Sequence, residues 1–401
     1  MHILAAKIQY LLRKEITEIY LMSAIHTFAE SMISLFIPIF LLTKGYSLLS
    51  VILYELIHYS AALIFGYYAL YFSAKNGVKH SLFLSIPISI LFYFLLFRID
   101  FLIGAFGNIA TLFILGTLGS ISGAYYWMGF HLEFAKFSEA KTESRQVGLV
   151  NIISTTVSAL GPLFGALIIT SSGFDIMFIV VIFLLFFSVT PLFFSKEYHE
   201  PFQINIKGFL SSKEMKINAP YLGEGIRDIA AAIFWPLLMY FTLISLDNIG
   251  GIYAIANALL VIFTFYLSKK ISDINKHSIL RAGAYFHSIT LGLRVFLKTF
   301  FLITVIQSLG AISWAMVDIP FRTIFYTNTK NSGIGKIILN REIYLGIGRL
   351  IILVLFIILI LSFGVETALI VSIIFGAIAT FLMSQLSSIP SKEEENAPKN
   401  I

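Results

Sequence analysis

The sequence predicts an all-α polytopic membrane protein with twelve transmembrane helices in two pseudo-symmetric six-helix bundles. Of its 401 residues, 58% are hydrophobic and 12% are charged, whereas a soluble globular domain carries about 25% charged residues. The apolar residues fall into runs of about 20, which is the length that crosses a bilayer as a helix. The basic residues lie scattered between these runs, as they do in membrane proteins.

The same composition excludes several other classes of protein. The chain has no cysteine, so disulfide frameworks, zinc ribbons, iron–sulfur clusters and thiol chemistry are excluded. The formal charge of +6 would suit a nucleic-acid partner, but the basic residues form no patch, and we expect no nucleic acid. Gly333 and Gly335 lack the preceding strand and the spacing of a phosphate-binding loop. We therefore expect neither a cofactor nor a metal.

Twelve apolar segments of spanning length follow one another along the chain. The ninth is the weakest, because Arg281, Arg294 and Lys298 crowd it. No segment between the spans is long enough to fold into a soluble catalytic domain. The predicted spans are 17–43, 49–73, 81–97, 102–130, 147–171, 176–195, 221–246, 250–268, 279–295, 299–326, 342–363 and 366–388.

The longest loop divides these spans into two sets of six. Its residues alternate in charge and show no apolar periodicity, which is typical of a solvated connection. We predict an N-terminal bundle over 1–195, a cytoplasmic central loop over 196–220 and a C-terminal bundle over 221–388. The remaining 389–401 contain Glu393, Glu394 and Glu395, a charge run that predicts a disordered cytoplasmic tail.

The basic residues also predict how the chain lies in the cell membrane. With twelve spans and a cytoplasmic N-terminus, the outer loops hold only Lys44, Arg98, Arg294 and Lys298. The other basic residues between the spans fall on the inner side, and cytoplasmic loops carry such an excess. We therefore expect a multi-pass protein with both termini in the cytoplasm.

An internal repeat relates the two predicted halves. The segment 123–127 (GAYYW) of the fourth span matches 310–314 (GAISW) of the tenth, and on this offset His131 meets Asp318. Parallel six-helix halves related by an axis along the membrane normal enclose a central cavity. The repeat therefore predicts a chamber between the halves.

These features resemble the major facilitator superfamily, over nearly the full length of the chain. In the fifth span, residues 161–166 (GPLFGA) are similar to the Gly-Pro antiporter motif of that family. Gly161 and Gly165 would let a neighbouring helix approach closely, and Pro162 leaves a carbonyl without its helical donor. The alternative interpretation is an ordinary kinked packing helix.

The loop between the second and third spans resembles the best-known signature of the same family. Gly77, Lys75 and Lys79 fit that signature, but Ala74 occupies its acidic position. The corresponding loop between the eighth and ninth spans keeps Asp273 and lacks the glycine. The resemblance implies that these loops help to latch the inner gate, in a divergent form.

The resemblance implies a secondary active transporter that works by alternating access, without enzymatic activity. We expect proton-coupled efflux of an organic solute, that is, antiport. The expected partners are a small-molecule substrate, protons or another coupling ion, and the lipid bilayer around a monomer. A multi-pass enzyme acting on a lipid-linked substrate, or a non-transporting sensor on a transporter fold, are the alternatives.

Ionisable side chains inside the predicted spans are the candidate functional residues, because a charge in hydrocarbon is costly. Glu30 lies midway along the first span, and His26 lies four residues earlier on the same helical face. We predict Glu30 as the acid that couples transport to protons. A purely structural hydrogen bond between helices is the alternative.

A second group of candidates lies in the tenth and eleventh spans. Asp318 and Arg322 are four residues apart, so they can form an ion pair within the helix. We predict a role in gating or substrate contact, or a structural pair. Arg349 needs a partner at its depth, and we expect either Asp318 or an anionic ligand to supply it.

The sequence favours structural or solvated interpretations for three other charged groups. Glu55 and His58 share a face near the outer end of the second span, where we expect solvation; a role in an outer vestibule or a proton relay is the alternative. Glu224, Arg227 and Asp228 suit the first turn of a helix. His131 and Glu133 belong to what we interpret as a solvated inner loop.

Aromatic side chains supply candidate walls for the chamber. Trp127 and Trp314 occupy matching positions in the repeat, and we predict both as substrate contacts. The alternative is that they pack between helices or lie at the membrane interface, as most aromatics in spanning helices do. The other aromatic candidates are Tyr125, Tyr126 and Trp235.

Overall fold

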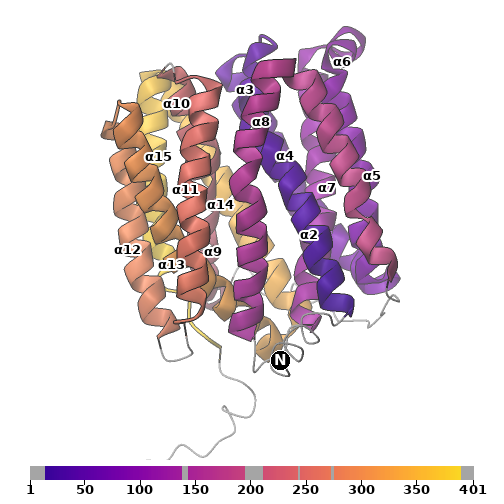
Figure 1. Cartoon of the computed structure of the whole chain (residues 1–401), viewed down its shortest axis with the longest axis vertical. Helices are drawn as coiled ribbons and strands as arrows, with labels where there is room; N and C mark the ends of the chain where they lie inside the picture. Colours follow the sequence, from indigo (N-terminus) through magenta and orange to yellow (C-terminus); the bar gives the residue numbers. More distant parts are fainter. Residues whose placement is uncertain (1–13, 138–142, 195–210, 243, 272–274, 390–401) are drawn as a thin grey trace, which may run out of the picture.

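The computed structural model describes residues 14–137, 143–194, 211–242, 244–271 and 275–389. Over these described residues the chain is helical and contains no β-strand. Figure 1 shows the helices aligned along one long axis, with the N-terminal half (indigo to magenta) beside the C-terminal half (orange to yellow). We call the end where α2 begins and α15 ends the terminal end. The opposite end carries α3, α6 and α10 (Figure 1).

The N-terminal half contains six rods. Helix α2 continues through the short turn η1 into α3, and these three form the first rod. Helix α8 forms two rods, because Gly173, at φ 83°, breaks it inside. The helices are α2 (Lys14–Ile33), η1 (Ser34–Phe36), α3 (Ile37–Thr43), α4 (Leu48–Asn76), α5 (Val78–Phe97), α6 (Ile99–Phe106), α7 (Asn108–Phe137), α8 (Glu143–Ser188) and η2 (Thr190–Phe194).

The C-terminal half repeats this order. Its first rod again has a local irregularity, a π-helical turn η3 between α9 and α10, where the N-terminal half has η1. The helices are α9 (Ser212–Ile229), η3 (Ala230–Phe234), α10 (Trp235–Phe241), α11 (Leu246–Ser268), α12 (Lys276–Leu293), η4 (Arg294–Phe296), α13 (Phe300–Ser332), α14 (Ile334–Phe363) and α15 (Val365–Met383).

The predicted fold class is confirmed. Nine helices among the described residues are long and apolar enough to cross a membrane by composition alone. One of them, Thr156–Phe193, contains the break at Gly173 and therefore supplies two rods. The remaining two rods, α9 to α10 and α12, carry charged residues and fail that criterion. Together these make twelve rods in two sets of six.

Several predicted boundaries are wrong, among them the start of the eleventh span, which was expected at 342 although α14 begins at Ile334. The fourth span was expected from 102, but Gly107, at φ 79°, separates the short α6 from α7, which begins at Asn108. The seventh span was expected from 221, but α9 begins at Ser212, where the Ser211 hydroxyl accepts a hydrogen bond from the Glu214 N–H. The tenth span extends to Ser332 rather than 326. Hydropathy misplaces these ends because an apolar run continues across Gly107 and the ends of α9 and α13 are polar.

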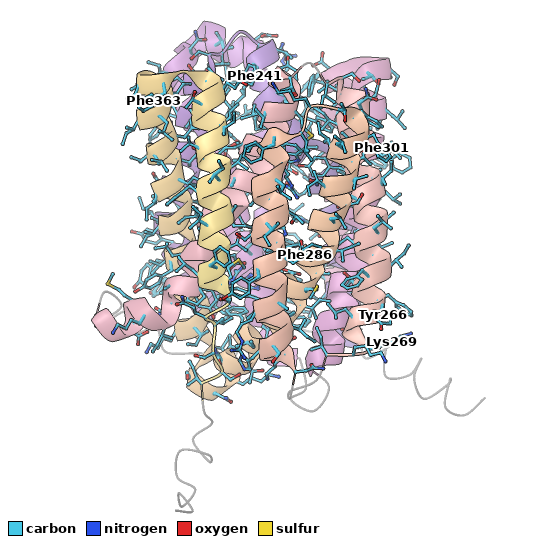
Figure 2. The ribbon with its side chains drawn as sticks, turned by 90° about the vertical axis from the view of Figure 1, so that its left-hand side faces the viewer. Phe241, Tyr266, Lys269, Phe286, Phe301 and Phe363 are labelled. Carbon is cyan, nitrogen blue, oxygen red and sulfur yellow. The ribbon has the colours of Figure 1, made fainter. Side chains whose placement is uncertain are left out.

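The outer surface of the bundle is apolar. Figure 2 shows side chains pointing outward along its height, including Phe301 and Phe363 towards one end and Tyr266 towards the other. Phe301 and Phe363 are 73% and 66% exposed. Such a surface is suited to lipid and not to water, so the chain is a multi-pass membrane protein.

Small residues bring the first and fifth rods of each half together. A methyl group at Gly161 would overlap Ser31 of α2, and one at Gly165 would overlap the Met32 carbonyl. In the C-terminal half, a methyl group at Gly348 of α14 would overlap the Leu222 carbonyl of α9. The predicted close approach at Gly161 and Gly165 is therefore confirmed, and it has a counterpart in the other half.

Gly77 joins α4 to α5 in a single residue at the terminal end. Its φ of 106° is a conformation that only glycine adopts without strain, and its N–H donates to the Ser73 carbonyl at 3.0 Å. The nearby Lys79 is buried, and its ammonium lies 2.9 Å from the Glu18 carboxylate of α2. The predicted loop over 74–79 is thus a sharp turn fastened to the first rod.

Candidate functional site

A cavity of about 680 Å³ lies between the two halves, and we call it the chamber. The lining residues come from α2, η1, α3, α4, α5, α7 and α8 on one side and from α9, η3, α11, α12, η4, α13 and α14 on the other. A cavity of this size accommodates an organic molecule. The predicted site residues that line it are His26, Glu30, Trp127, Pro162, Trp314 and Arg349.

The N-terminal wall presents Glu30 and His26 from the same face of α2, as predicted. The Tyr93 hydroxyl of α5 donates a hydrogen bond to Glu30 Oε2 at 2.7 Å. The His26 ring stacks on Tyr126, with 3.6 Å between ring centroids and an interplanar angle of 7°. Aromatic packing therefore fixes the imidazole, while Glu30 is held by a hydroxyl group and not by a cation.

Glu55 and His58 line the same wall, which contradicts the expected solvation. Glu55 is 6% exposed, and the Nδ1 atom of His58 is buried without a hydrogen-bond partner. The prediction failed because the first turns of α4 pack against the C-terminal half, where Leu48 and Ile52 join its apolar core. The chamber therefore holds a second acid that the sequence analysis placed in water.

The C-terminal wall holds Arg349 in an ion pair that the sequence analysis did not predict. The Arg349 guanidinium lies 2.9 Å from Asp228 Oδ2 of α9. The prediction that Asp318 is the partner of Arg349 is wrong, because Asp318 accepts a hydrogen bond from Arg322 Nε at 2.7 Å within α13. Arg349 also lies over the Tyr59 ring of α4 at 4.9 Å, so it contacts both halves.

Arg227 and His287 form a second polar connection in this wall. Arg227 Nε donates to His287 Nε2 at 3.0 Å, and the guanidinium lies 3.5 Å above the Trp314 ring. Since Nε2 accepts, His287 is a neutral imidazole with its proton on Nδ1. That proton faces the Gly310 carbonyl at 3.1 Å and the Ser313 hydroxyl at 3.0 Å. The repeat segment 310–314 thus lies at the chamber wall, as its partner 123–127 does.

The structural interpretation of Glu224, Arg227 and Asp228 as first-turn residues is wrong. Because α9 begins at Ser212, these side chains lie in its later turns, and Arg227 lines the chamber. Each of them binds a partner on another helix: Glu224 binds Arg341, Arg227 binds His287 and Asp228 binds Arg349. The error in the helix start therefore concealed three residues of the site.

The chamber is closed towards the terminal end by contacts between the halves. The lining residues of α7 stop at Met128, and His131 lies one turn beyond. Its Nδ1 is 2.9 Å from the Tyr326 hydroxyl of α13, and its Nε2 is 3.2 Å from Arg341 Nη1 of α14. Arg341 in turn binds Glu224 at 2.6 Å. We call His131, Tyr326, Arg341 and Glu224 the terminal gate.

The expectation of a solvated loop around His131 and Glu133 is therefore wrong. His131 is 2% exposed and Glu133 is 3% exposed, and both belong to α7. The predicted ion pair between Asp318 and Arg322 is confirmed, but neither residue lines the chamber. Asp273 lies outside the described residues.

Arg294 is the residue that the sequence analysis missed most completely. At the end of the predicted ninth span it was counted with the basic residues of the outer loops, but it is 3% exposed and lines the chamber. A signal was present, because Arg294 lies seven residues after His287 and such residues share a helical face. Hydropathy alone could not distinguish an inward-facing arginine from a loop residue.

Comparisons with known proteins agree with this geometry. The family description of the Major Facilitator Superfamily matches residues 19–340. A curated relative, the Uncharacterized protein YqgE of Bacillus subtilis (strain 168), is 20% identical over 270 residues. That match covers 63% of this chain and 62% of the relative, so it spans less than two thirds of the relative's own length.

Three solved structures, of two proteins, have the same fold over almost the whole chain. The human organic anion transporter MFSD10 (TETRAN) superposes with a TM-score of 0.64 at 11% identity, covering 92% of this chain and 99% of that one. The E. coli fucose:proton symporter FucP gives 0.67 at 12% identity, covering 94% and 98%. FucP in its outward conformation gives 0.66 at 12% identity, covering 94% and 100%.

Proposed function

This chain belongs to the Major Facilitator Superfamily and is a membrane transporter, and on that premise we propose that it moves an organic solute by proton-coupled alternating access. We assign the proton to Glu30. The observation that carries this proposal is the chamber between the halves, with Glu30 in its wall. A member of a transporter family with such a chamber needs no catalytic group to perform its function.

The closure of the terminal end supports alternating access. The terminal gate joins α7 of one half to α13 and α14 of the other, at the end of the chamber nearest the chain termini. Access from that end requires His131 to part from Tyr326 and Arg341. Rocking of one half against the other would accomplish this while leaving the packing inside each half unchanged.

The bonding of Glu30 supports its role in proton transfer. Among the described residues, no Lys, Arg or His lies within ion-pair distance of its carboxylate, and its hydrogen bond comes from the Tyr93 hydroxyl. Of the other acids near the chamber, Asp228 and Glu342 each pair with an arginine, which keeps them ionised, whereas Glu55 has no ion-pair partner among the described residues. A carboxyl bound to a hydroxyl can lose and regain a proton without breaking an ion pair.

We propose export as the direction of transport. The Gly161-Pro162 segment supports it, since its resemblance is to an antiporter motif and its glycines pack closely against α2. The excess of basic residues at the terminal end supports a cytoplasmic location for that end. Proton symport, the activity in the name of FucP, is the competing outcome.

Proteoliposomes with an imposed pH gradient test the proposal. We would load them with p-aminohippurate, an organic anion, or L-fucose, a neutral sugar, and measure efflux with the outside made acidic. Antiport predicts faster efflux, and symport predicts slower efflux. In Glu30→Gln the response to the gradient should vanish, whereas Glu366→Gln, at an exposed acid, should retain it. A gradient response that persists unchanged in Glu30→Gln would rule out coupling through Glu30.

A further inference from the structure

Arg294 is a buried cation of the chamber without an acidic partner. Among the described residues, no carboxylate lies within ion-pair distance of its guanidinium, and its Nε–H donates to no acceptor. The other two arginines of the chamber each have a carboxylate partner, because Arg349 binds Asp228 and Arg227 binds both Asp228 and His287. Arg294 therefore differs from them in lining the chamber without a carboxylate partner.

The guanidinium of Arg294 is held firmly in this position. It lies directly against Gly310 of α13, where a methyl group would overlap it, and it faces the Trp235 ring at 5.5 Å. The side chain is 3% exposed. Close packing on two sides fixes the direction of the guanidinium, so that the unused donor is preorganised for a ligand.

Three further polar groups around Arg294 are buried without hydrogen-bond partners. They are the Tyr253 hydroxyl, the Gln307 Oε1 atom and the Trp235 Nε1–H group. Tyr253 and Gln307 line the chamber together with Arg294. Gln307 lies one helical turn from Gly310, and Tyr253 is within electrostatic reach of the Arg294 charge. Unmet polar groups are rare in folded proteins and call for an explanation.

We propose that Arg294 and Tyr253 form an anion-binding subsite that takes the carboxylate of an organic solute. A buried guanidinium is costly unless it is paired, and a bound carboxylate supplies the missing charge. The planar fork of arginine matches the two oxygens of a carboxylate, and the Tyr253 hydroxyl adds a donor. This inference deepens the proposed function and rests on it, because it names the class of solute.

The opposite wall gives the subsite an orientation. Glu30 and Glu55 line the N-terminal side of the chamber, where no lining residue is an arginine or a lysine that could bind an anion. The carboxylate is therefore held at the C-terminal wall, and the uncharged part of the solute extends towards the aromatic rings of Trp127 and Tyr59. The subsite thus selects solutes with one anionic end and an apolar remainder.

A binding measurement on the purified full-length chain in detergent tests this subsite. The chain has three tryptophans, and Trp127 and Trp314 line the chamber while Trp235 contacts Arg294. Tryptophan fluorescence therefore reports binding. We would titrate benzoate and benzamide, which have the same size and differ in charge. We expect benzoate to bind at least tenfold more tightly than benzamide, and Arg294→Gln to abolish that preference.

Two further variants keep the test informative if Arg294→Gln fails to fold. Arg98→Gln removes an exposed arginine and should leave the preference for benzoate unchanged. Tyr253→Phe removes one hydroxyl and should weaken benzoate binding several-fold without affecting benzamide. Equal affinity of the parent chain for the two probes, a preference that survives in Arg294→Gln, or a preference that is undiminished in Tyr253→Phe, would overturn the proposal.

The outcome is separable from that of the proposed function, because binding in detergent needs no transport. If benzoate binding depends on Arg294 but the chain shows no proton-driven flux, the subsite is supported and the proposed proton coupling is wrong. If the chain shows proton-driven flux but no benzoate binding that depends on Arg294, the proposed coupling is supported and the subsite is wrong.

Discussion

The two halves place an acid at the same point of their first rod and bind it differently. Glu30 and Asp228 each lie eight residues before a proline, Pro38 in α3 and Pro236 in α10. Asp228 is held by Arg349 and Arg227, whereas Glu30 receives a single hydrogen bond from Tyr93. The same position in the repeat has thus become a fixed ion pair in one half and an exchangeable acid in the other.

The backbone packing around these acids shows no such difference. In both halves a glycine of the fifth rod lies against a carbonyl of the first rod, Gly165 on Met32 and Gly348 on Leu222. The repeat has therefore kept the contacts that shape each bundle and has changed the charges that face the chamber. We infer that the N-terminal wall serves the proton and the C-terminal wall serves the solute.

The largest expected effect comes from breaking the ion pair of the C-terminal half. Asp228→Asn leaves Arg349 and Arg227 without their acid, and we expect a loss of roughly 3 kcal/mol in stability. The equivalent Glu30→Gln should cost less than about 1 kcal/mol, because the amide oxygen still accepts from Tyr93. Unfolding of both variants in detergent measures the difference. Equal losses would show that the two acids have equivalent roles.

Substitution of the packing glycines should have a smaller effect that is similar in both halves. Gly165→Ala and Gly348→Ala each force a methyl group onto a backbone carbonyl, and we expect a loss of about 1–3 kcal/mol. Gly123→Ala is the matched control, because no atom lies within 4 Å of a methyl group there. The unfolding temperature of Gly123→Ala should therefore be close to that of the parent chain. If Gly165→Ala lowers the stability and Gly348→Ala does not, the two halves do not depend on equivalent packing contacts.

The smallest expected effect concerns the terminal gate. Tyr326→Phe removes the hydroxyl that contacts His131 and should weaken closure by about 1 kcal/mol, or about fivefold in the population of the open state. A cysteine at Met128, the last lining residue of α7, would then react about five times faster with an impermeant maleimide added at the terminal end. Tyr285→Phe, at an exposed tyrosine, should not change the rate. If the rate of maleimide labelling is unchanged in Tyr326→Phe, the contact between Tyr326 and His131 does not help to close the chamber.

The fold could be predicted from the sequence because its main determinant, the length of the apolar runs, can be read directly along the chain. Runs of about 20 apolar residues specify spanning helices wherever they occur, and the repeat at 123–127 and 310–314 placed matching helices in matching positions. The failures at Gly107 and Ser212 occurred where hydropathy and helix geometry diverge. An apolar run does not reveal a glycine turn within it, and a polar helix start looks like a loop.

The site could be predicted only in part, because partners depend on tertiary contacts. Glu30 and His26 were found since a charge in the middle of a span is visible in the sequence. Arg322 and Asp318 were found since their spacing alone permits a pair. Asp228 and Arg349 are separated by 121 residues, and nothing local indicates that they meet. The inward direction of Arg294 likewise depends on how α12 packs against α13.

The central claim is that protonation of Glu30 shifts the balance between two arrangements of the halves. The native chain lacks cysteine, so spin labels can be attached at introduced cysteine pairs. Ile109 with Phe301 reports the opposite end, and Asn76 with Lys269 reports the terminal end; all four residues are exposed. Double electron–electron resonance in lipid nanodiscs would give both distances at low and at high pH. The account predicts that the two distances change in opposite senses with pH and that Glu30→Gln abolishes the change. Distances that do not respond to pH, or that respond equally in Glu30→Gln, would contradict it.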